Sequence, residues 1–229
     1  MPGSDRETIA KTVDSLGKSG VVDDKIVFSG NGFESNLPGV SVVRSSGFAS
    51  TESVKKMGQL AKADFVLLYT KSHQLDLGRF ALQRMMQVCE ASGAGMVYSD
   101  YYENKDGRLS PHPVIDYQEG SLRDDFNFGS LMLFDAQAFR DACASMNKDF
   151  KAAGLYDLRL KVSQKYKLVH LPELLYTEVE TDLRKSGEKQ FDYVDPRNRA
   201  VQIEMEKACT EHLKKVKGYL KPDFKNIKF

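Results

Sequence analysis

The middle of the chain alternates short apolar runs with one amphipathic segment. An apolar run at residues 65–69 precedes apolar residues at helical spacing over about 76–90, and a second apolar run lies at 96–98. Two buried runs too short for helices, separated by an amphipathic helix, indicate a βαβ unit. Ligands of open α/β sheets bind outside the carboxyl ends of the strands. The polar residues that follow the two runs, Thr70 and Asp100, are therefore the first places where a site is expected.

The same pattern extends toward the N-terminus. Ser4 and Glu7 have the spacing of a capping box, which predicts the start of a helix. Apolar runs at 25–28 and 40–44 predict two strands, and the stretch 51–61 has the spacing of an amphipathic helix.

Toward the C-terminus, a turn and an irregular segment come before further elements. Asn104 to Gly107 predict a tight turn, since Asp-Gly favours positive φ. The segment 111–126 is polar, contains two prolines and has no period, which is typical of a binding loop. Beyond it the pattern predicts a strand at 128–134, helices at 135–144 and 155–164, and strands at 167–172, where Pro172 ends the first, and 173–179.

The chain divides into three parts by composition. Residues 1–181 are expected to form one domain. Residues 182–196 are charged and lack an apolar period, so a surface linker is expected there. Residues 197–229 combine a helical stripe with an extended basic tail, which has the character of a tether to something further downstream.

Composition and charge exclude several classes of protein. A net charge of +1 over 229 residues gives no indication of nucleic acid as the main partner. No apolar stretch approaches the ~20 residues of a membrane span, and the N-terminus lacks the apolar core of a signal peptide. Cys89, Cys143 and Cys209 are odd in number and far apart, which favours packing thiols in a reducing, cytoplasmic setting.

Four segments resemble motifs of family 2 glycosyltransferases with the GT-A fold. Residues 61–69 are similar to the family's "A-x-G-E-Y-I-x-F-L" strand, and residues 97–100 to its "V-Y-G/S-D" strand end. Residues 156–160 resemble the helix that carries "E-D-x-D-L-x-L-R", and residues 169–176 resemble "I-x-H-I-P-x-x-L-Y". The resemblance spans roughly residues 6–179, with the four pieces in the family's order.

This resemblance implies an α/β fold with a mixed, mostly parallel sheet flanked by helices. It also implies transfer of a sugar from a nucleotide-diphosphate sugar to a saccharide acceptor, as in polysaccharide biosynthesis. The family begins with a mid-sheet strand similar to "V-S-V-I-I-P-x-Y-N", whereas this chain starts at the tail end of that motif with Pro2 to Asp5. The first strand is therefore expected to be missing or truncated. A second copy of the chain, a downstream transferase domain or the C-terminal helix is expected to cover the open edge.

The donor site implied by the resemblance departs from the family pattern. Ser29 to Asn31 stand where an acidic residue usually meets the nucleotide base, and Thr70, Lys71 and Ser72 stand at the D-x-D positions. Carboxylates at that spacing would bind a divalent metal. Hydroxyls replace them poorly, so no residue is assigned as a metal ligand. Mn²⁺ or Mg²⁺ is expected only if substrate phosphates hold it, whereas Lys71 could meet a phosphate directly. A plain polar loop is the alternative interpretation.

The catalytic base is also displaced from the family pattern. The "E-D" positions fall on Gly154 and Leu155, neither of which accepts a proton. Asp157, Asp125 and Asp100 are the remaining candidates. A salt bridge is the alternative role for Asp157, a solvated charge pair for Asp125, and a turn cap for Asp100.

Tyr98, Asp100 and His112 are the candidates for contact with the acceptor sugar. His112 lies between two prolines, where a simple loop position is the alternative. His170 lies between Val169 and Leu171, a context more typical of a hydrogen-bonded core histidine than of a ligand.

Two functions follow from the sequence. The first is a glycosyltransferase-like domain that transfers a sugar from a nucleotide-diphosphate sugar. The second is a catalytically inactive domain of the same fold, which binds or regulates as part of a longer, multidomain glycosyltransferase.

Overall fold

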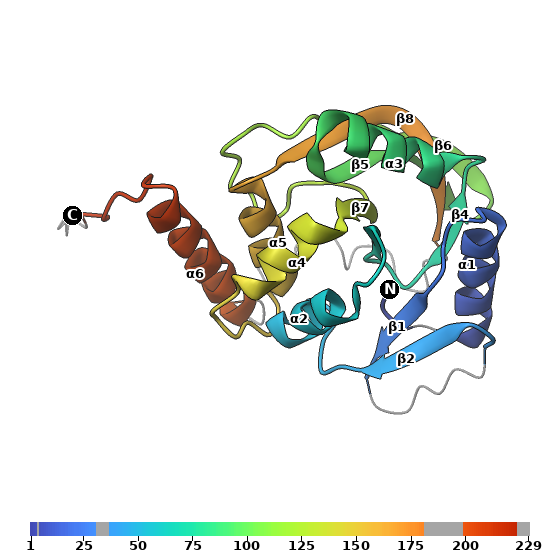
Figure 1. The fold of residues 1–229 in the computed structure, drawn as a ribbon, viewed down its shortest axis with the longest axis horizontal. Coiled ribbons are helices and arrows are strands. Elements are labelled where there is room, and N and C mark those ends of the chain that lie inside the picture. The colour runs from blue at the N-terminus through green and yellow to red at the C-terminus, as the bar shows by residue number, and fades with distance from the viewer. Residues whose placement is uncertain (4, 31–36, 181–198, 224–229) are drawn as a thin grey trace.

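The computed structural model describes residues 1–3, 5–30, 37–180 and 199–223, and it shows a curled sheet surrounded by helices (Figure 1). The helices are α1 (Arg6–Lys18), α2 (Thr51–Leu60), α3 (Ala81–Ser92), α4 (Ala136–Ala144), α5 (Gly154–Ser163) and α6 (Arg199–Lys215). The strands are β1 (Lys25–Ser29), β2 (Val40–Arg44), β3 (Phe65–Tyr69), β4 (Gln74–Leu77), β5 (Ala94–Lys105), β6 (Arg108–His112), β7 (Leu131–Asp135) and β8 (Lys167–Glu180).

The main sheet is mixed and has the order β3-β7-β5-β8-β4, with β6 paired to β5. The α/β class and the mixed sheet confirm the sequence-based prediction. Strands β5 and β8 are parallel, but β7 runs antiparallel to both of its neighbours and β4 runs antiparallel to β8. Antiparallel pairings therefore outnumber parallel ones among the described strands, in contrast to the mostly parallel sheet that the resemblance implies.

Strands β1 and β2 form a separate parallel pair. In the described part of the chain, no strand joins β1 to β3. The residues before α1 lie beside β1, because Phe28 N–H donates to Met1 O at 2.8 Å and Gly3 N–H donates to Phe28 O at 2.7 Å. Pro2 forms a parallel bridge with Phe28. Residues 1–3 therefore pair with β1, and the truncation of a first strand stays a prediction.

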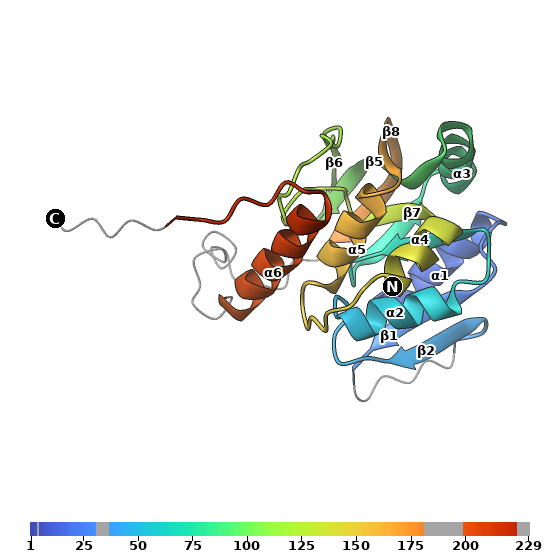
Figure 2. The ribbon, with the colours of Figure 1, turned by 60° about the vertical axis from the view of Figure 1, so that its left-hand side comes forward.

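The C-terminal helix α6 packs on α5, far from β1 and β3 (Figures 1 and 2). Its buried Ala208 belongs to a small apolar cluster with Phe150, Tyr156 and Leu160. The prediction that this helix covers the edge of the missing strand is therefore wrong. The predicted linker at residues 182–196 lies outside the described residues.

Two element ends differ from the prediction. The cap of α1 is Asp5, whose carboxylate accepts from Thr8 N–H at 2.9 Å, whereas Ser4 lies outside the described residues. Residues Gln74–Leu77 form β4, whereas the sequence predicts a polar loop up to Gln74 and a helix from about Asp76. They pair antiparallel with β8, and Leu75 is fully buried there, so tertiary pairing overrides the helical pattern.

A third difference from the prediction concerns Pro172, where the sequence predicts the end of a strand. Strand β8 continues through this residue because the register against β5 shifts at Ser99 and Asp100, which pair with Leu171 and Leu174. The intervening proline lies at a bulge, where a missing N–H is tolerated. The predicted turn before β6 is confirmed, since Asp106 and Gly107 both have positive φ, 51° and 81°.

The cysteines behave as packing thiols. Cys89 and Cys143 are buried, and Cys209 is half-buried, with no disulfide among them. Burial raises the pKa of Cys89 to about 11 and that of Cys143 to about 12, which keeps both as neutral thiols. Among the described residues, no helix has the length and apolar character that a membrane span requires.

Candidate functional site

The loop after β3 carries the predicted diphosphate contacts. Thr70 is anchored, because its N–H and its hydroxyl both donate to Ser130 O, at 2.9 and 3.3 Å. The hydroxyl of Tyr69 donates to His73 O at 3.1 Å and holds the other end of the loop. Lys71 and Ser72 between these anchors are exposed. The loop is thus a fixed turn that presents one ammonium group and one hydroxyl to solvent.

The residues of this loop do not fit a metal held by protein carboxylates. Thr70 and Ser72 offer neutral hydroxyls at the two positions concerned, and the first of these is already engaged. No cluster of three or more His, Cys, Asp or Glu side chains suited to a metal occurs within the described residues.

The other predicted nucleotide contacts lie at the end of β1. Ser29 O accepts from Ser45 N–H at 2.9 Å. Gly3 packs so closely on Ser29 that a Cβ atom on Gly3 would lie 2.6 Å from Ser29 Oγ. The side chain of Ser29 therefore faces the residues that precede α1. Asn31 lies outside the described residues.

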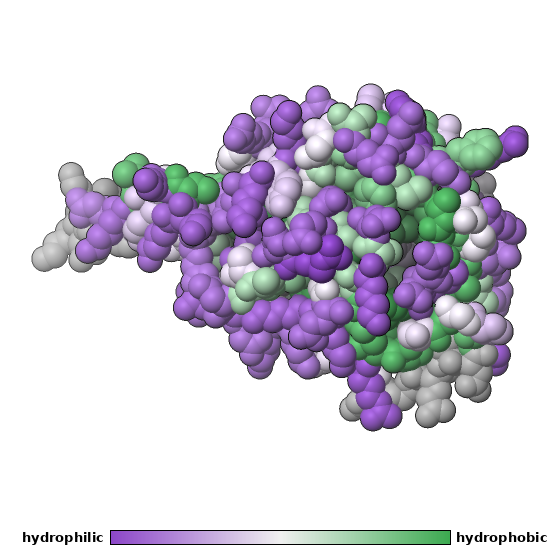
Figure 3. Space-filling model, viewed as in Figure 1, coloured by the Kyte–Doolittle hydropathy of each residue, from purple (hydrophilic) through white to green (hydrophobic). Residues whose placement is uncertain are grey.

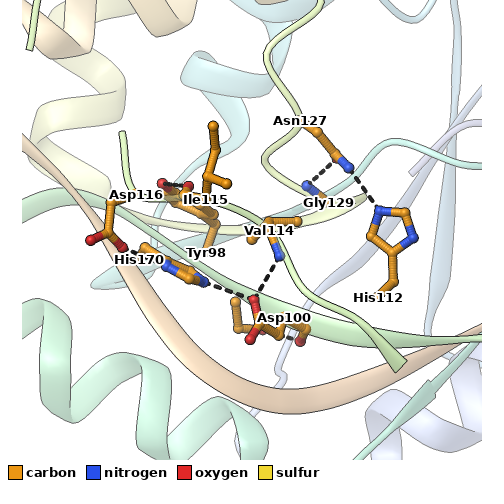
Figure 4. A network of polar contacts seen from close by, with 10 residues as sticks. Tyr98, Asp100, His112, Val114, Ile115, Asp116, Asn127, Gly129 and His170 are labelled. Carbon is orange, nitrogen blue, oxygen red and sulfur yellow. Dashed lines mark hydrogen bonds and ion pairs between the residues drawn. The ribbon is translucent and has the colours of Figure 1, made fainter. Parts of the chain in front are cut away.

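Asp100 belongs to a polar network at the middle of β5 (Figure 4). Its Oδ1 accepts from Val114 N–H at 2.8 Å and lies 2.9 Å from His170 Nε2. His170 Nδ1 lies 2.7 Å from Asp116 Oδ1. The His170 ring stacks on Tyr98, with ring centroids 5.2 Å apart. One imidazole thus connects a buried carboxylate with one whose side chain is 81% exposed.

Two residues predicted to contact the acceptor sugar, Tyr98 and Asp100, have hydrogen-bond partners within this network. Tyr98 is fully buried, and its hydroxyl donates to Ile115 O at 2.8 Å. The side chain of His170 is 6% exposed and hydrogen-bonded, which confirms its interpretation as a core histidine. Asp100 binds the backbone of the segment after β6, 14 positions along the chain, and not the next turn that its alternative role names. Its contact with His170 was not indicated by the sequence, because the two residues are 70 positions apart.

His112 ends β6 at one border of the network. Its ring stacks on Tyr101 with centroids 4.5 Å apart, and its Nε2 lies 3.1 Å from Asn127 Nδ2 (Figure 4). Glu103 Oε1 lies 3.4 Å from Nδ1. His112 and Asp100 therefore flank the same short segment, Pro113–Asp116.

The predicted binding loop, 111–126, is fastened to α5. Arg159 donates to Ser121 O at 2.8 Å and to Arg123 O at 2.6 Å, and its guanidinium lies 5.8 Å from the centre of the Tyr117 ring. Tyr156 also donates to the loop. This segment is packed, although the sequence shows no period there, because one buried arginine satisfies its carbonyl groups.

Two of the candidate bases are ion-paired. Asp125 forms two hydrogen bonds of 2.9 Å with Arg123, and this side-chain contact holds the pKa of Asp125 below its usual range. Its side chain is 68% exposed. Asp157 is buried on α5, 3.0 Å from Lys161 Nζ, and burial raises its pKa although Lys161 opposes the shift. Both geometries agree with the structural alternatives, and a catalytic role for either stays a prediction.

A second group of buried polar residues lies beneath the loop after β3. The hydroxyl of Tyr176 accepts from Ser130 N–H at 2.9 Å. Glu178 shares its strand and is 5% exposed, yet neither its Oε1 nor the hydroxyl of Ser130 has a hydrogen-bond partner among the residues that the structure describes. Burial and then Glu178 raise the pKa of both Tyr69 and Tyr176. The period-2 spacing of Tyr176 and Glu178 was the available sequence signal for this group.

Solved structures of two glycosyltransferases are similar to this one. TarS 1–349 from S. aureus in complex with UDP-GlcNAc matches with a TM-score of 0.63 and 13% identity, over 93% of this chain and 64% of that chain. GalNAc-T7 with UDP, GalNAc and Mn²⁺ matches with a TM-score of 0.54 and 12% identity, over 92% of this chain and 48% of that chain. The chain has the GT-A fold.

The chain spans less than two thirds of the length of the TarS structures that it matches. For the structure with UDP, the match covers 63% of that chain. No protein-family model and no curated protein matches the sequence. The identities are too low to transfer an activity, so the likeness establishes the fold, and the site must be argued from its own residues.

Proposed function

We propose that this chain is a glycosyltransferase-like domain that binds a nucleotide-diphosphate sugar at the carboxyl ends of β1 and β3. The observation that carries the proposal is the loop Thr70–Ser72, which follows β3 in a GT-A fold and presents an exposed ammonium. An ammonium binds phosphate as a point charge. Lys71 thus balances the diphosphate directly, and any Mn²⁺ or Mg²⁺ arrives with the phosphates of the substrate.

Binding without transfer is the activity that the geometry favours for this chain alone. Asp157 and Asp125 are ion-paired, the first of them inside the core. A base must accept a proton from the acceptor hydroxyl at hydrogen-bond distance. Asp157 is buried away from such a contact, and Asp125 is engaged by Arg123 at the surface. The domain then serves as a binding or regulatory part of a longer glycosyltransferase.

Sugar transfer is the second candidate, supported by one observation. Asp100 and His170 are 2.9 Å apart, and His170 continues to the exposed Asp116. A carboxylate joined to an imidazole is an arrangement that can accept and pass on a proton. In this alternative, Asp100 is the base, and Tyr98 and His112 hold the segment that meets the acceptor saccharide.

Calorimetric titration with UDP-GlcNAc, UDP-GalNAc, UDP-glucose and UDP-galactose tests the proposal, with Mn²⁺, with Mg²⁺ and with EDTA. We expect one donor to bind in EDTA, and Lys71→Ala to weaken its affinity about tenfold, since one charged phosphate contact is lost. Lys55→Ala, an exposed lysine on α2, is the matched control and should leave affinity unchanged.

The outcomes separate the candidates. Binding that disappears in EDTA would contradict a metal-independent diphosphate site, and failure of all four donors to bind would overturn the proposal. Release of free sugar, or its transfer to a saccharide, that is lost in Asp100→Asn would favour the second candidate over the first.

A further inference from the structure

A carboxylate and three hydroxyl groups are buried together near the carboxyl ends of β3 and β8. They belong to Tyr69, Ser130, Tyr176 and Glu178, each of which is 5% exposed or less. Ser130 N–H donates to the hydroxyl of Tyr176 at 2.9 Å. Glu178 lies two positions further along β8 than Tyr176, so both side chains point to the same face of the sheet. One face of β8 thus carries a buried charge beside buried hydroxyl groups.

Electrostatic effects confirm that these four groups are neighbours. Burial raises the pKa of both phenol groups, those of Tyr69 and Tyr176. The charge of Glu178 raises both pKa values further, whereas the hydroxyl of Ser130 lowers them. Because their pKa values are raised, both phenols are neutral at pH 7. The cluster therefore combines one negative charge with three neutral hydroxyl oxygens.

Two atoms of this cluster, Glu178 Oε1 and Ser130 Oγ, have no hydrogen-bond partner within the described part of the chain. A buried charge is normally paired with an opposite charge or bound to a cation. Glu103 lies directly opposite Glu178 on the parallel strand β5, and like charges in that position repel each other. Nearby Lys105 and His112 both contact Glu103, at 2.8 and 3.4 Å. The charge of Glu178 is therefore the one that calls for a further partner.

The cluster is distinct from the apolar groove between β1 and β3. In the space-filling view, hydrophobic residues surround a hollow on the face that carries the N-terminus (Figure 3). Tyr69 is among the residues that line this groove, whereas Ser130, Tyr176 and Glu178 are not. The polar cluster therefore meets the groove only at Tyr69.

We propose that Glu178 Oε1, Ser130 Oγ and the hydroxyl oxygen of Tyr69 bind one alkali cation, Na⁺ or K⁺. Hard cations bind oxygen ligands, and one carboxylate balances one positive charge. The hydroxyl of Tyr69 donates its hydrogen to His73 O, which leaves its lone pairs for the ion. Tyr176 is a positioning residue, since its oxygen already accepts from the N–H groups of Ser130 and Leu131.

The charge of the cluster argues against a divalent ion. Protein sites for Ca²⁺ and Mg²⁺ use several carboxylates or the phosphates of a substrate. The described residues include no group of three or more His, Cys, Asp or Glu side chains that could hold a metal. A single carboxylate among hydroxyl groups is matched in charge by a monovalent cation.

The ion would hold the loop Thr70–Ser72 against the sheet, because both ends of this loop depend on ligand residues. Thr70 N–H donates to Ser130 O at 2.9 Å, and the hydroxyl of Tyr69 donates to His73 O at 3.1 Å. A cation that joins these two residues to Glu178 fastens the loop to β8. The site requires no nucleotide sugar, so it stands independently of the proposed function.

The test compares thermal unfolding in the chlorides of sodium, potassium and N-methylglucamine at equal ionic strength, without nucleotide. The large organic cation screens charges but is too bulky for a buried site. In a saturating concentration of one of the alkali salts, the native protein should unfold at a temperature about 4 °C higher, because an ion that binds only the folded state stabilises it.

Protein variants locate the site. Glu178→Gln keeps the shape of the side chain but removes its charge, and it should unfold at the same temperature in all three salts. In the organic salt, where the native carboxylate lacks a counter-ion, this variant should be at least as stable as the native protein. Ser130→Ala should require about tenfold more alkali salt for half of the shift. Glu119→Gln, at an exposed position, is the matched control and should keep the full response.

Hydrogen exchange gives a second measurement, which reports on the loop itself. In the native protein, the alkali salt should slow exchange of residues 70–73 about tenfold relative to the organic salt, and it should leave exchange of α6 unchanged. In Glu178→Gln, exchange of residues 70–73 should be the same in both salts.

Three results would overturn the proposal. Equal unfolding temperatures of the native protein in all three salts would show that water, rather than a cation, satisfies the two unpartnered atoms. An alkali response that Glu178→Gln retains in full would show that the ion binds elsewhere. Stabilisation by Mg²⁺ without any response to the alkali salts would contradict the assignment of a monovalent ion.

Discussion

Glu178 illustrates at the residue scale how a buried charge can mark a functional position. Glu178 is 5% exposed, and its Oε1 has no hydrogen-bond partner within the described residues. A buried carboxylate oxygen without a partner costs free energy, which is why such an atom can mark a functional position. Its place on β8 beneath the Thr70–Ser72 loop puts it next to the proposed sugar-nucleotide site.

We predict that Glu178→Gln raises the free energy of unfolding by about 1 kcal/mol, because it removes a charge that is poorly compensated. Urea denaturation monitored by circular dichroism at pH 7 measures this change. Glu119→Gln, at an exposed position, is the control and should leave stability unchanged. A loss of stability in Glu178→Gln would instead show that the carboxylate has a compensating partner, such as a bound water.

Chemistry at single residues was predictable only where it depends on sequence neighbours. The salt bridge of Asp157 with Lys161 is local and agrees with the predicted alternative role of Asp157. The partner of Asp125, Arg123, is also a sequence neighbour, but the sequence analysis did not name it. The contact between Asp100 and His170 joins residues 70 positions apart. It depends on the parallel alignment of β5 with β8, which no local pattern encodes.

At the scale of elements, α5 depends on α6 for its cap. The N-cap residue of α5, Ala153, has no side chain that could accept a hydrogen bond. Glu204 of α6 accepts from Lys151 N–H at 3.1 Å, from Ala152 N–H at 2.8 Å and from Ala153 N–H at 3.2 Å. One carboxylate thus satisfies backbone donors of another element and joins the two helices.

We predict that Glu204→Gln lowers the free energy of unfolding by about 1 kcal/mol, the usual worth of a helix cap. Burial opposes the charge on Glu204, but the three backbone N–H donors outweigh it and lower its pKa. A carboxylate whose pKa is lower in the folded state than in the unfolded state stabilises the fold at pH values above its unfolded-state pKa. This stabilisation is lost as the pH falls through the folded-state pKa.

The free energy of unfolding should therefore differ most between the native protein and Glu204→Gln at pH 7. This difference should disappear as the pH falls below 4.5, the ordinary pKa of glutamate. Thermal unfolding between pH 3 and pH 7 measures it, with Glu206→Gln on the exposed face of α6 as the control. A difference that persists unchanged at pH 3 would contradict a role for the charge.

At the scale of the whole molecule, the fold was predictable to the extent that its pattern is local. The alternation of apolar runs and amphipathic helices identified most elements. The direction of β7 and the strand at Gln74–Leu77 were not predicted, because both depend on pairing with distant strands. The position of α6 on α5 likewise results from tertiary packing.

The pair β1-β2 has fewer strand partners than the centre of the main sheet. Strand β1 pairs with β2 and with three N-terminal residues, whereas β5 pairs with β6, β7 and β8. Elements that share few hydrogen bonds with the rest of a domain open before its core does. We therefore predict that the amides of β1 and β2 exchange with deuterium at least about tenfold faster than those of β5 and β8.

Hydrogen exchange measured by mass spectrometry on peptides that cover residues 25–44 and 94–105 tests this prediction, because the two regions are far apart in sequence. Exchange of all these regions at one common rate would show that the protein opens as a single cooperative unit, although no described strand joins β1 to β3.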